Sequence, residues 1–153
     1  MVKKPQLNIL IIGTGMYVSG RGTDGYGTIL PAVYEWMRKG RQGDIYIAGS
    51  RSEGIEEIKK KVRELNELYG FTITPKYYPD DVADDHEAYL KAMKGISRPA
   101  CALIATPDNI HRKVAGDTIQ NGLHSLVVKP LAPTLKEVEE LIKLQETHQV
   151  YCA

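Results

Sequence analysis

The sequence contains few cysteines, little net charge and no long apolar segment. Its two cysteines, Cys101 and Cys152, lie in apolar, strand-like surroundings without a C-x-x-C spacing, so we expect buried thiols rather than a disulfide or a metal site. The 20 lysines and arginines almost balance the 19 aspartates and glutamates, which leaves a formal charge of +1. Nucleic acids and membrane surfaces select clustered basic residues, so neither is expected as a partner.

Targeting and membrane segments are equally lacking. No segment approaches the ~18 consecutive apolar residues of a membrane helix. The apolar run near the N-terminus is too short for a signal peptide and ends in glycines rather than in a cleavage site. We therefore expect a cytoplasmic protein. Its 153 residues, 42% of them hydrophobic, fit a single globular domain with its own core.

What the sequence does contain is a regular alternation of apolar runs and amphipathic segments. Apolar runs predict strands at residues 7–12, 44–48, 71–78, 100–105 and 123–128. Helical spacing of apolar residues predicts helices at residues 28–39, 53–69, 84–94, 107–121 and 134–148. Alternation at this spacing indicates parallel strands with right-handed crossovers. The expected fold is an α/β, doubly wound parallel sheet of the Rossmann type, with three αβα layers.

The last four residues, 150–153, are apolar and follow a predicted helix. They read as the opening of a sixth strand. A strand that stops after a few residues favours a sequence cut from a larger protein, whereas a natural domain with a short edge strand is the alternative. On the first interpretation, residues 1–153 form one nucleotide-binding domain, and a C-terminal substrate domain lies outside the chain.

A glycine-rich segment follows the first predicted strand. Gly13 permits a tight turn, and Gly15 lets the backbone approach a pyrophosphate without a Cβ in the way. We therefore expect the segment from Gly13 through Thr14 and Gly15 to Met16 to bind a dinucleotide. Val18 stands where the third glycine of G-x-G-x-x-G belongs, and further glycines lengthen the loop to residue 27. The alternative is a mobile glycine loop without a ligand.

The residues after the second predicted strand bear on which nucleotide binds. NAD-binding domains place an acidic residue there to accept a hydrogen bond from the ribose 2′-OH. This sequence has Ser50, Arg51 and Ser52, and no carboxylate before Glu53. An arginine pairs with a 2′-phosphate, which a carboxylate would repel, and the serines add hydroxyl donors. The pattern predicts NADP(H), with NAD(H) as the second choice. A solvated arginine at a helix start is the alternative for Arg51.

Two segments in the second half carry a family signature. Residues 105–111 read A-T-P-D-N-I-H after one predicted strand, and residues 122–131 read G-L-H-S-L-V-V-K-P-L around the next. In these segments the sequence resembles the Gfo/Idh/MocA oxidoreductases, relatives of glucose–fructose oxidoreductase and inositol dehydrogenase. That family has T-P-N-x-x-H and G-K-x-V-x-x-E-K-P-L segments in the same order. The resemblance spans nearly the whole chain.

The resemblance implies roles for particular residues. Thr106 and Pro107 would pack against the nicotinamide ribose, and His111 would lie near the cofactor or in the wall of its crevice. Lys129 would be the catalytic residue of this half, either polarising a substrate oxygen or hydrogen-bonding the cofactor ribose. A surface lysine before a proline is the alternative for Lys129. No histidine has metal-ligand spacing, so no metal is expected.

Two departures from the family pattern affect the same region. Val128 replaces a glutamate, which removes a partner for Lys129, and Asp108 replaces an asparagine but is still expected to cap the following helix. The family's general acid or base usually belongs to a second, β-rich domain. Hydride chemistry therefore cannot be completed by these residues alone.

The sequence thus predicts the nucleotide half of an NADP-dependent oxidoreductase. Its substrate would be a sugar, cyclitol or similar polyol, changed at a carbinol or carbonyl carbon. The resemblance also implies a homo-oligomeric parent. One alternative is a sensor or scaffold that binds NADP(H) without turnover, which the presence of Val128 keeps open. Another is a methyltransferase, but a ribose-binding acid is then expected after the second strand, where Ser50, Arg51 and Ser52 stand.

Overall fold

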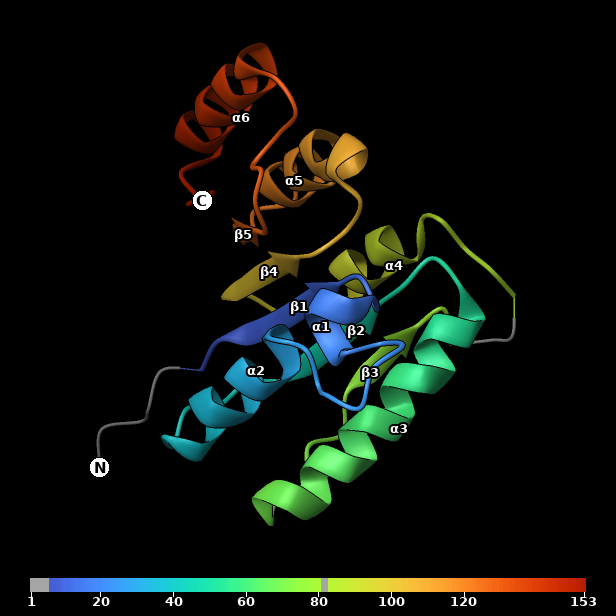
Figure 1. Ribbon diagram of the computed structural model, residues 1–153. Coiled ribbons are helices and arrows are strands. Elements are labelled where there is room, and N and C mark those ends of the chain that lie inside the picture. Colours follow the sequence, from blue (N-terminus) through green and yellow to red (C-terminus); the bar gives the residue numbers. More distant parts are fainter. Residues whose placement is uncertain (1–5, 81–82) are drawn as a thin grey trace, which may run out of the picture.

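The computed structural model describes residues 6–80 and 83–153 and contains a parallel five-stranded sheet flanked by helices (Figure 1). The strands are β1 (Asn8–Ile12), β2 (Ile45–Ala48), β3 (Lys76–Tyr78), β4 (Ala100–Ile104) and β5 (His124–Val127). The helices are α1 (Met16–Ser19), α2 (Ile29–Arg38), α3 (Ser52–Tyr69), α4 (Ala88–Gly95), the 3-10 turn η1 (Asp108–Ile110), α5 (His111–Gln120) and α6 (Leu135–His148).

The sheet has the order β3-β2-β1-β4-β5, with every neighbouring pair parallel. β1 lies in the centre, and all five of its residues are buried. Its central place explains why residues 7–12 form an almost unbroken apolar run, since a strand covered on both faces has no side exposed to water. The strand order reverses at β1, between β2 and β4, so the carboxyl ends of these three strands meet at the switch point of the sheet.

Alternate residues of β1 feed two separate cores. Ile9 and Ile11 belong to the cluster that α2 and α3 cover, whereas Leu10 and Ile12 belong to the cluster that α4, α5 and α6 cover. This alternation follows from the two-residue period of a strand. The result is the expected three-layer αβα arrangement, a doubly wound Rossmann-type sheet.

The predicted elements agree with the structure in order and type, with differences at their ends. The expected strand at 71–78 is confined to Lys76–Tyr78, and the helix expected from residue 84 begins at Ala88. The loop expected at residues 13–27 contains the short helix α1. At the other end of the chain, Ser125 N–H donates to the Tyr151 carbonyl (2.7 Å), and a parallel bridge joins Ser125 to Cys152. The final residues therefore extend the sheet beside β5, as expected.

The two cysteines are free thiols in different cores. Cys101 packs against the α2–α3 cluster and Cys152 against the opposite one, so the sheet separates them. Both side chains are only partly buried. Burial raises the pKa of both thiols. Within residues 6–80 and 83–153, no helix is both long and apolar enough to cross a bilayer, and no cluster of metal-ligating side chains occurs.

Candidate functional site

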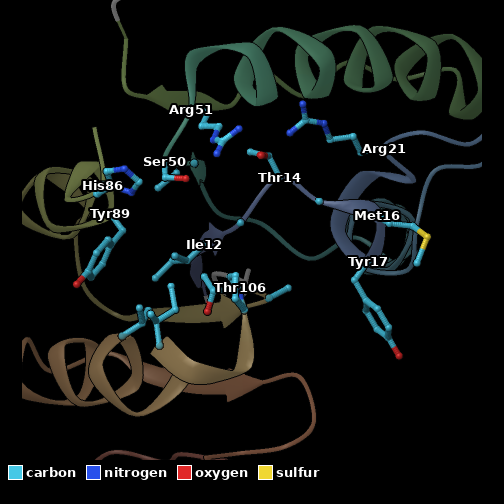
Figure 2. Close-up of a pocket in the computed structure, with 18 residues that line it drawn as sticks. Ile12, Thr14, Met16, Tyr17, Arg21, Ser50, Arg51, His86, Tyr89 and Thr106 are labelled. Atoms are coloured by element: carbon cyan, nitrogen blue, oxygen red, sulfur yellow. The ribbon is translucent and has the colours of Figure 1, made fainter. Parts of the chain in front are cut away.

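A cleft of about 590 Å³ opens at the carboxyl ends of β1, β2 and β4, the switch point of the sheet (Figure 2). Its volume lies within the range of small-molecule sites in proteins. The residues that line it come from the glycine turn after β1, the segment after β2, the approach to α4, and the segment after β4. They are Ile12, Gly13, Thr14, Gly15, Met16, Tyr17, Arg21, Ala48, Gly49, Ser50, Arg51, His86, Tyr89, Ala105, Thr106, Pro107, Ile110 and Val114.

The glycine turn after β1 lies against the end of β4. Gly13 has a φ of +124°, and a Cβ on it would lie 2.3 Å from the carbonyl oxygen of Ala105. Both the backbone conformation and the contact therefore require glycine at this position. A Cβ on Gly15 would meet nothing within 4 Å, so its backbone faces open space in the cleft. This is the backbone approach that a dinucleotide turn needs.

The structure explains why Val18 can stand in place of the third glycine of the motif. Its side chain is completely buried in the cluster under α2 and α3. The third glycine of the usual motif permits close packing of the first long helix on the strand. Here the short helix α1 occupies that place, and the long helix α2 begins only at Ile29. The insertion between them thus removes the steric need for glycine at position 18.

The segment after β2 is fixed on the glycine turn through Thr14. A Cβ on Gly49 would lie 2.7 Å from the Thr14 Cγ2, and a Cβ on Gly54 would lie 2.4 Å from the Thr14 Oγ1. Two glycines therefore make room for this threonine and bring the start of α3 beside the cleft. Ser50 and Arg51 are exposed there and line the cleft.

Ser52 has a different surrounding from Ser50 and Arg51. Its backbone N–H and its hydroxyl both donate to the Asp84 carboxylate, at 3.0 and 3.2 Å. Ser52 is the first residue of α3 and is not part of the cleft lining. The first carboxylate after β2, that of Glu53, forms an ion pair with Arg21 (3.2 Å), and Arg21 itself lines the cleft. Nothing in the sequence pattern singled out Arg21, because its place depends on the fold of the glycine-rich loop.

The segment after β4 supplies the opposite wall. Thr106 and Pro107 line the cleft, and the Thr106 Oγ1 is buried without a hydrogen-bond partner among the described residues. A buried hydroxyl without a partner is costly, and a bound polar ligand would relieve that cost. Asp108 begins η1, and its side chain caps neither η1 nor α5, so the expected cap is wrong. The turn over Pro107 takes the place of a helix cap, with Ile110 N–H donating to the Pro107 carbonyl.

His111 lies beneath the cleft and joins the two signature segments. Its ring is fully buried, with Nδ1 2.6 Å from the Pro130 carbonyl oxygen and Nε2 2.8 Å from that of Thr106. The ring is not part of the cleft lining. Lys129 lies in a smaller pocket of about 240 Å³, which shares Thr106 and Tyr17 with the main cleft. The structure therefore brings Lys129 next to the cleft and places His111 behind it.

The remaining wall was not predicted from the sequence. His86 and Tyr89 reach the cleft from the α4 side (Figure 2). Ile110 of η1 and Val114 of α5 also line it. The Tyr89 hydroxyl donates to the Asp117 carboxylate (2.6 Å), which fixes the ring. Burial, followed by this hydrogen bond, raises the pKa of Tyr89. A wall of aromatic and aliphatic side chains suits an aromatic base.

Comparison with known families decides the relationship that the two signature segments suggested. The family model described as an oxidoreductase family with an NAD-binding Rossmann fold, Gfo/Idh/MocA, matches residues 7–153. The chain belongs to the Gfo/Idh/MocA family. No curated protein matches the sequence.

Solved structures agree with the Gfo/Idh/MocA fold at low sequence identity. An NAD-binding protein from Listeria innocua has 18% identity and a TM-score of 0.59 over 98% of this chain. The 3-ketoreductase KijD10 from Actinomadura kijaniata, solved with TDP-benzene and NADP, has 16% identity and a TM-score of 0.59 over 95%. The WlbA dehydrogenase from Bordetella pertussis, solved with NADH and UDP-GlcNAcA, has 14% identity and a TM-score of 0.56 over 98%.

This chain spans about a third of these neighbours, namely 34% of the Listeria protein, 37% of KijD10 and 36% of WlbA. Membership in the Gfo/Idh/MocA family makes it an NAD-binding oxidoreductase domain, since that is what the family model describes. The neighbours contain either NADP or NADH, so the family alone does not select the nucleotide. That selection must come from the residues of this cleft.

Proposed function

We propose that this chain is the NADP(H)-binding half of an oxidoreductase that acts on a carbinol or carbonyl carbon of a sugar, cyclitol or similar polyol. One observation carries the choice of nucleotide. Ser50 and Arg51 line the cleft after β2, where NAD-binding domains have an acidic residue. Arginine and serine side chains offer the donors that a 2′-phosphate accepts.

The residues present fit a pyridine dinucleotide. Gly13 and Gly15 put no side chain of their own into the turn after β1, and the Thr106 hydroxyl needs a partner. Ser50 and Arg51 would hold the 2′-phosphate end, and the glycine turn with Met16 would hold the pyrophosphate. Thr106 and Pro107 would contact the nicotinamide ribose. The cleft of about 590 Å³ joins these segments into one site.

Lys129 is our candidate for the catalytic residue of this half. Lys129 lines the pocket that adjoins the cleft at Thr106 and Tyr17. There it would donate a hydrogen bond to a substrate oxygen and polarise it, or hold the cofactor ribose. His111 would support this arrangement from behind, since its ring contacts the carbonyl of Pro130, the residue that follows Lys129. The bound nicotinamide supplies the hydride chemistry.

The substrate class rests on the neighbours. KijD10 was solved with a nucleoside diphosphate ligand and WlbA with a nucleotide sugar, and both are about three times as long as this chain. We therefore propose that a further domain of the parent protein completes the substrate site.

Calorimetric titration of the chain with NADPH and NADH tests the choice of nucleotide. We expect NADPH to bind at least about tenfold more tightly than NADH. This is the difference in binding free energy that one to two charge-assisted hydrogen bonds to the 2′-phosphate would give. Arg51→Ala is expected to remove most of this preference. Arg38→Ala is the matched control, because Arg38 pairs with Glu35 on an exposed face of α2 away from the cleft. Tighter binding of NADH, or an unchanged preference in Arg51→Ala, would refute the proposal.

A second candidate function is NADP(H) binding without turnover. Val128 favours it, because the side chain before Lys129 is not the glutamate that the family pattern has there, and the carboxylate in the pocket they share is that of Asp108. The protein with its substrate domain separates the two functions. Oxidation of NADPH by a sugar or polyol ketone supports the enzyme, and binding of NADPH without turnover over a panel of such ketones supports the sensor.

A further inference from the structure

The glycine-rich loop from residue 20 to residue 27 is a folded unit held on α3. A Cβ on Gly20 would lie 2.2 Å from the Gly25 carbonyl oxygen, and one on Gly27 would lie 2.7 Å from that of Met16. The backbone of the loop therefore packs on itself. Lys61 of α3 donates to the carbonyls of Thr23 (3.2 Å) and Gly25 (2.8 Å). These contacts fix the loop beside the first turns of α3.

Arg21 is the residue that this loop delivers to the cleft. Its Nε lies 2.5 Å from the Glu57 Oε2, and its Nη2 lies 3.2 Å from the Glu53 Oε2. Its Nη1 faces the start of α3, 3.5 Å from the position of a Cβ on Gly54. Figure 2 shows Arg21 and Arg51 on either side of Thr14, at the same end of the cleft.

The carboxylate of Glu53 is a problem for a site that selects a 2′-phosphate. Glu53 follows Arg51 by two residues and lies in the first turn of α3. It is the first carboxylate after β2, and a carboxylate near the ribose repels a 2′-phosphate and accepts a hydrogen bond from a free 2′-OH. Its side chain is 72% exposed, and among the residues that the structure describes it is restrained by the ion pair with Arg21.

We infer that Arg21 is a second determinant of nucleotide preference, and that it acts through Glu53. The inference rests on the proposed NADP(H) function. Arg21 is a positioning residue: Glu57 orients its guanidinium, and the guanidinium pairs with Glu53 and holds that carboxylate outside the cleft lining. Without Arg21, Glu53 is free to select against a 2′-phosphate. The glycine-rich loop then has a role in the site, because it places Arg21 against α3.

Calorimetric titration of four proteins with NADPH and NADH tests the inference: wild type, Arg21→Ala, Glu53→Gln and the double variant. We expect Arg21→Ala to weaken NADPH binding about tenfold and NADH binding less than twofold. The released Glu53 carboxylate would repel the 2′-phosphate, which NADH lacks. Glu53→Gln alone should change NADPH binding less than twofold, because the ion pair with Arg21 already holds the carboxylate outside the cleft lining. The double variant should recover most of the lost NADPH affinity. If Arg21 only supported the fold, Glu53→Gln would not restore the NADPH affinity that Arg21→Ala loses.

The outcomes separate this inference from the proposed function. If wild type prefers NADPH and Arg51→Ala abolishes the preference, but Arg21→Ala binds like wild type, the inference is wrong and the proposed function stands. The inference is also wrong if Arg21→Ala loses affinity and Glu53→Gln does not restore it. If wild type shows no preference for NADPH, both are wrong. Circular dichroism checks the fold of each variant, and should Arg21→Ala not fold, Arg21→Lys replaces it, with a smaller loss that Glu53→Gln must again relieve.

Discussion

Replacing Gly54 by alanine tests the packing that joins the glycine turn to α3. A Cβ on Gly54 would lie 2.4 Å from the Thr14 Oγ1 and 3.3 Å from the Thr14 Cβ. The first distance is far below any van der Waals contact, so the threonine or the helix must move. Overpacking of this kind costs about 1–3 kcal/mol. The helical preference of alanine over glycine returns about 0.5–1 kcal/mol.

The expected net effect of Gly54→Ala is a loss of about 1 kcal/mol in the free energy of unfolding, which corresponds to a Tm lower by about 2–4 °C for a domain of this size. Urea unfolding followed by far-ultraviolet circular dichroism measures it. The double variant with Thr14→Ala removes the colliding Oγ1 and should recover part of the loss. The Thr14 side chain lies in the cleft wall, so Gly54→Ala should also weaken NADPH binding.

Gly116→Ala is the matched control, since Gly116 also lies within a helix, α5. A Cβ there would meet its nearest atom at 3.5 Å, an ordinary contact. We expect Gly116→Ala to stabilise the protein by up to about 1 kcal/mol. If Gly54→Ala is as stable as Gly116→Ala, or if Thr14→Ala does not relieve it, the proposed packing of Thr14 between Gly49 and Gly54 is incorrect.

Three other predictions concern the scaffold of the cleft. Gly13→Ala should cost about 3 kcal/mol or more in urea unfolding, because its φ is positive and its Cβ would meet the Ala105 backbone; a loss below about 1 kcal/mol would contradict this. Thr134→Ala should cost about 1 kcal/mol, since Thr134 and Glu137 form the capping box of α6, and an unchanged midpoint would speak against the cap. Burial raises the pKa of Tyr77 to about 12, so the unfolded chain ionises first and stability falls as pH rises from about 10 through 12. Unfolding midpoints of Tyr77→Phe should fall less over that range, and equal slopes for the two proteins would exclude this cause.

The fold was largely predictable because its signals are local. The five buried residues of β1 come from an almost unbroken apolar run, and the capping box of α6 is formed by Thr134 and Glu137, which are three residues apart in the sequence. The positions of the ends of β3 and α4 were not predictable in this way. Pairing with β2 decides where β3 begins, and that pairing starts only at Lys76.

The backbone segments of the site were predictable from the sequence. The side chains that distant segments contribute to it were not. Gly13 and the segments after β2 and β4 line one cleft because parallel strands end at the same edge of a sheet. Ser52, by contrast, is held by a carboxylate 32 residues away, and no local pattern indicates such a contact. Arg21 depends in the same way on the folding of its loop against α3. His86 could not be assigned from the sequence, since helical periodicity near it does not say which side chain faces the cleft.

The central claim is that the carboxyl edge of β1, β2 and β4 is a pyridine nucleotide site. Backbone amide chemical shifts of the labelled chain, recorded during titration with NADP⁺, test it most directly. We expect saturable shifts at Gly13, Gly15, Arg51 and Thr106, with Gly122 at the opposite edge of the sheet unchanged. Shifts confined to that opposite edge, or no saturable shifts at millimolar nucleotide, would contradict it.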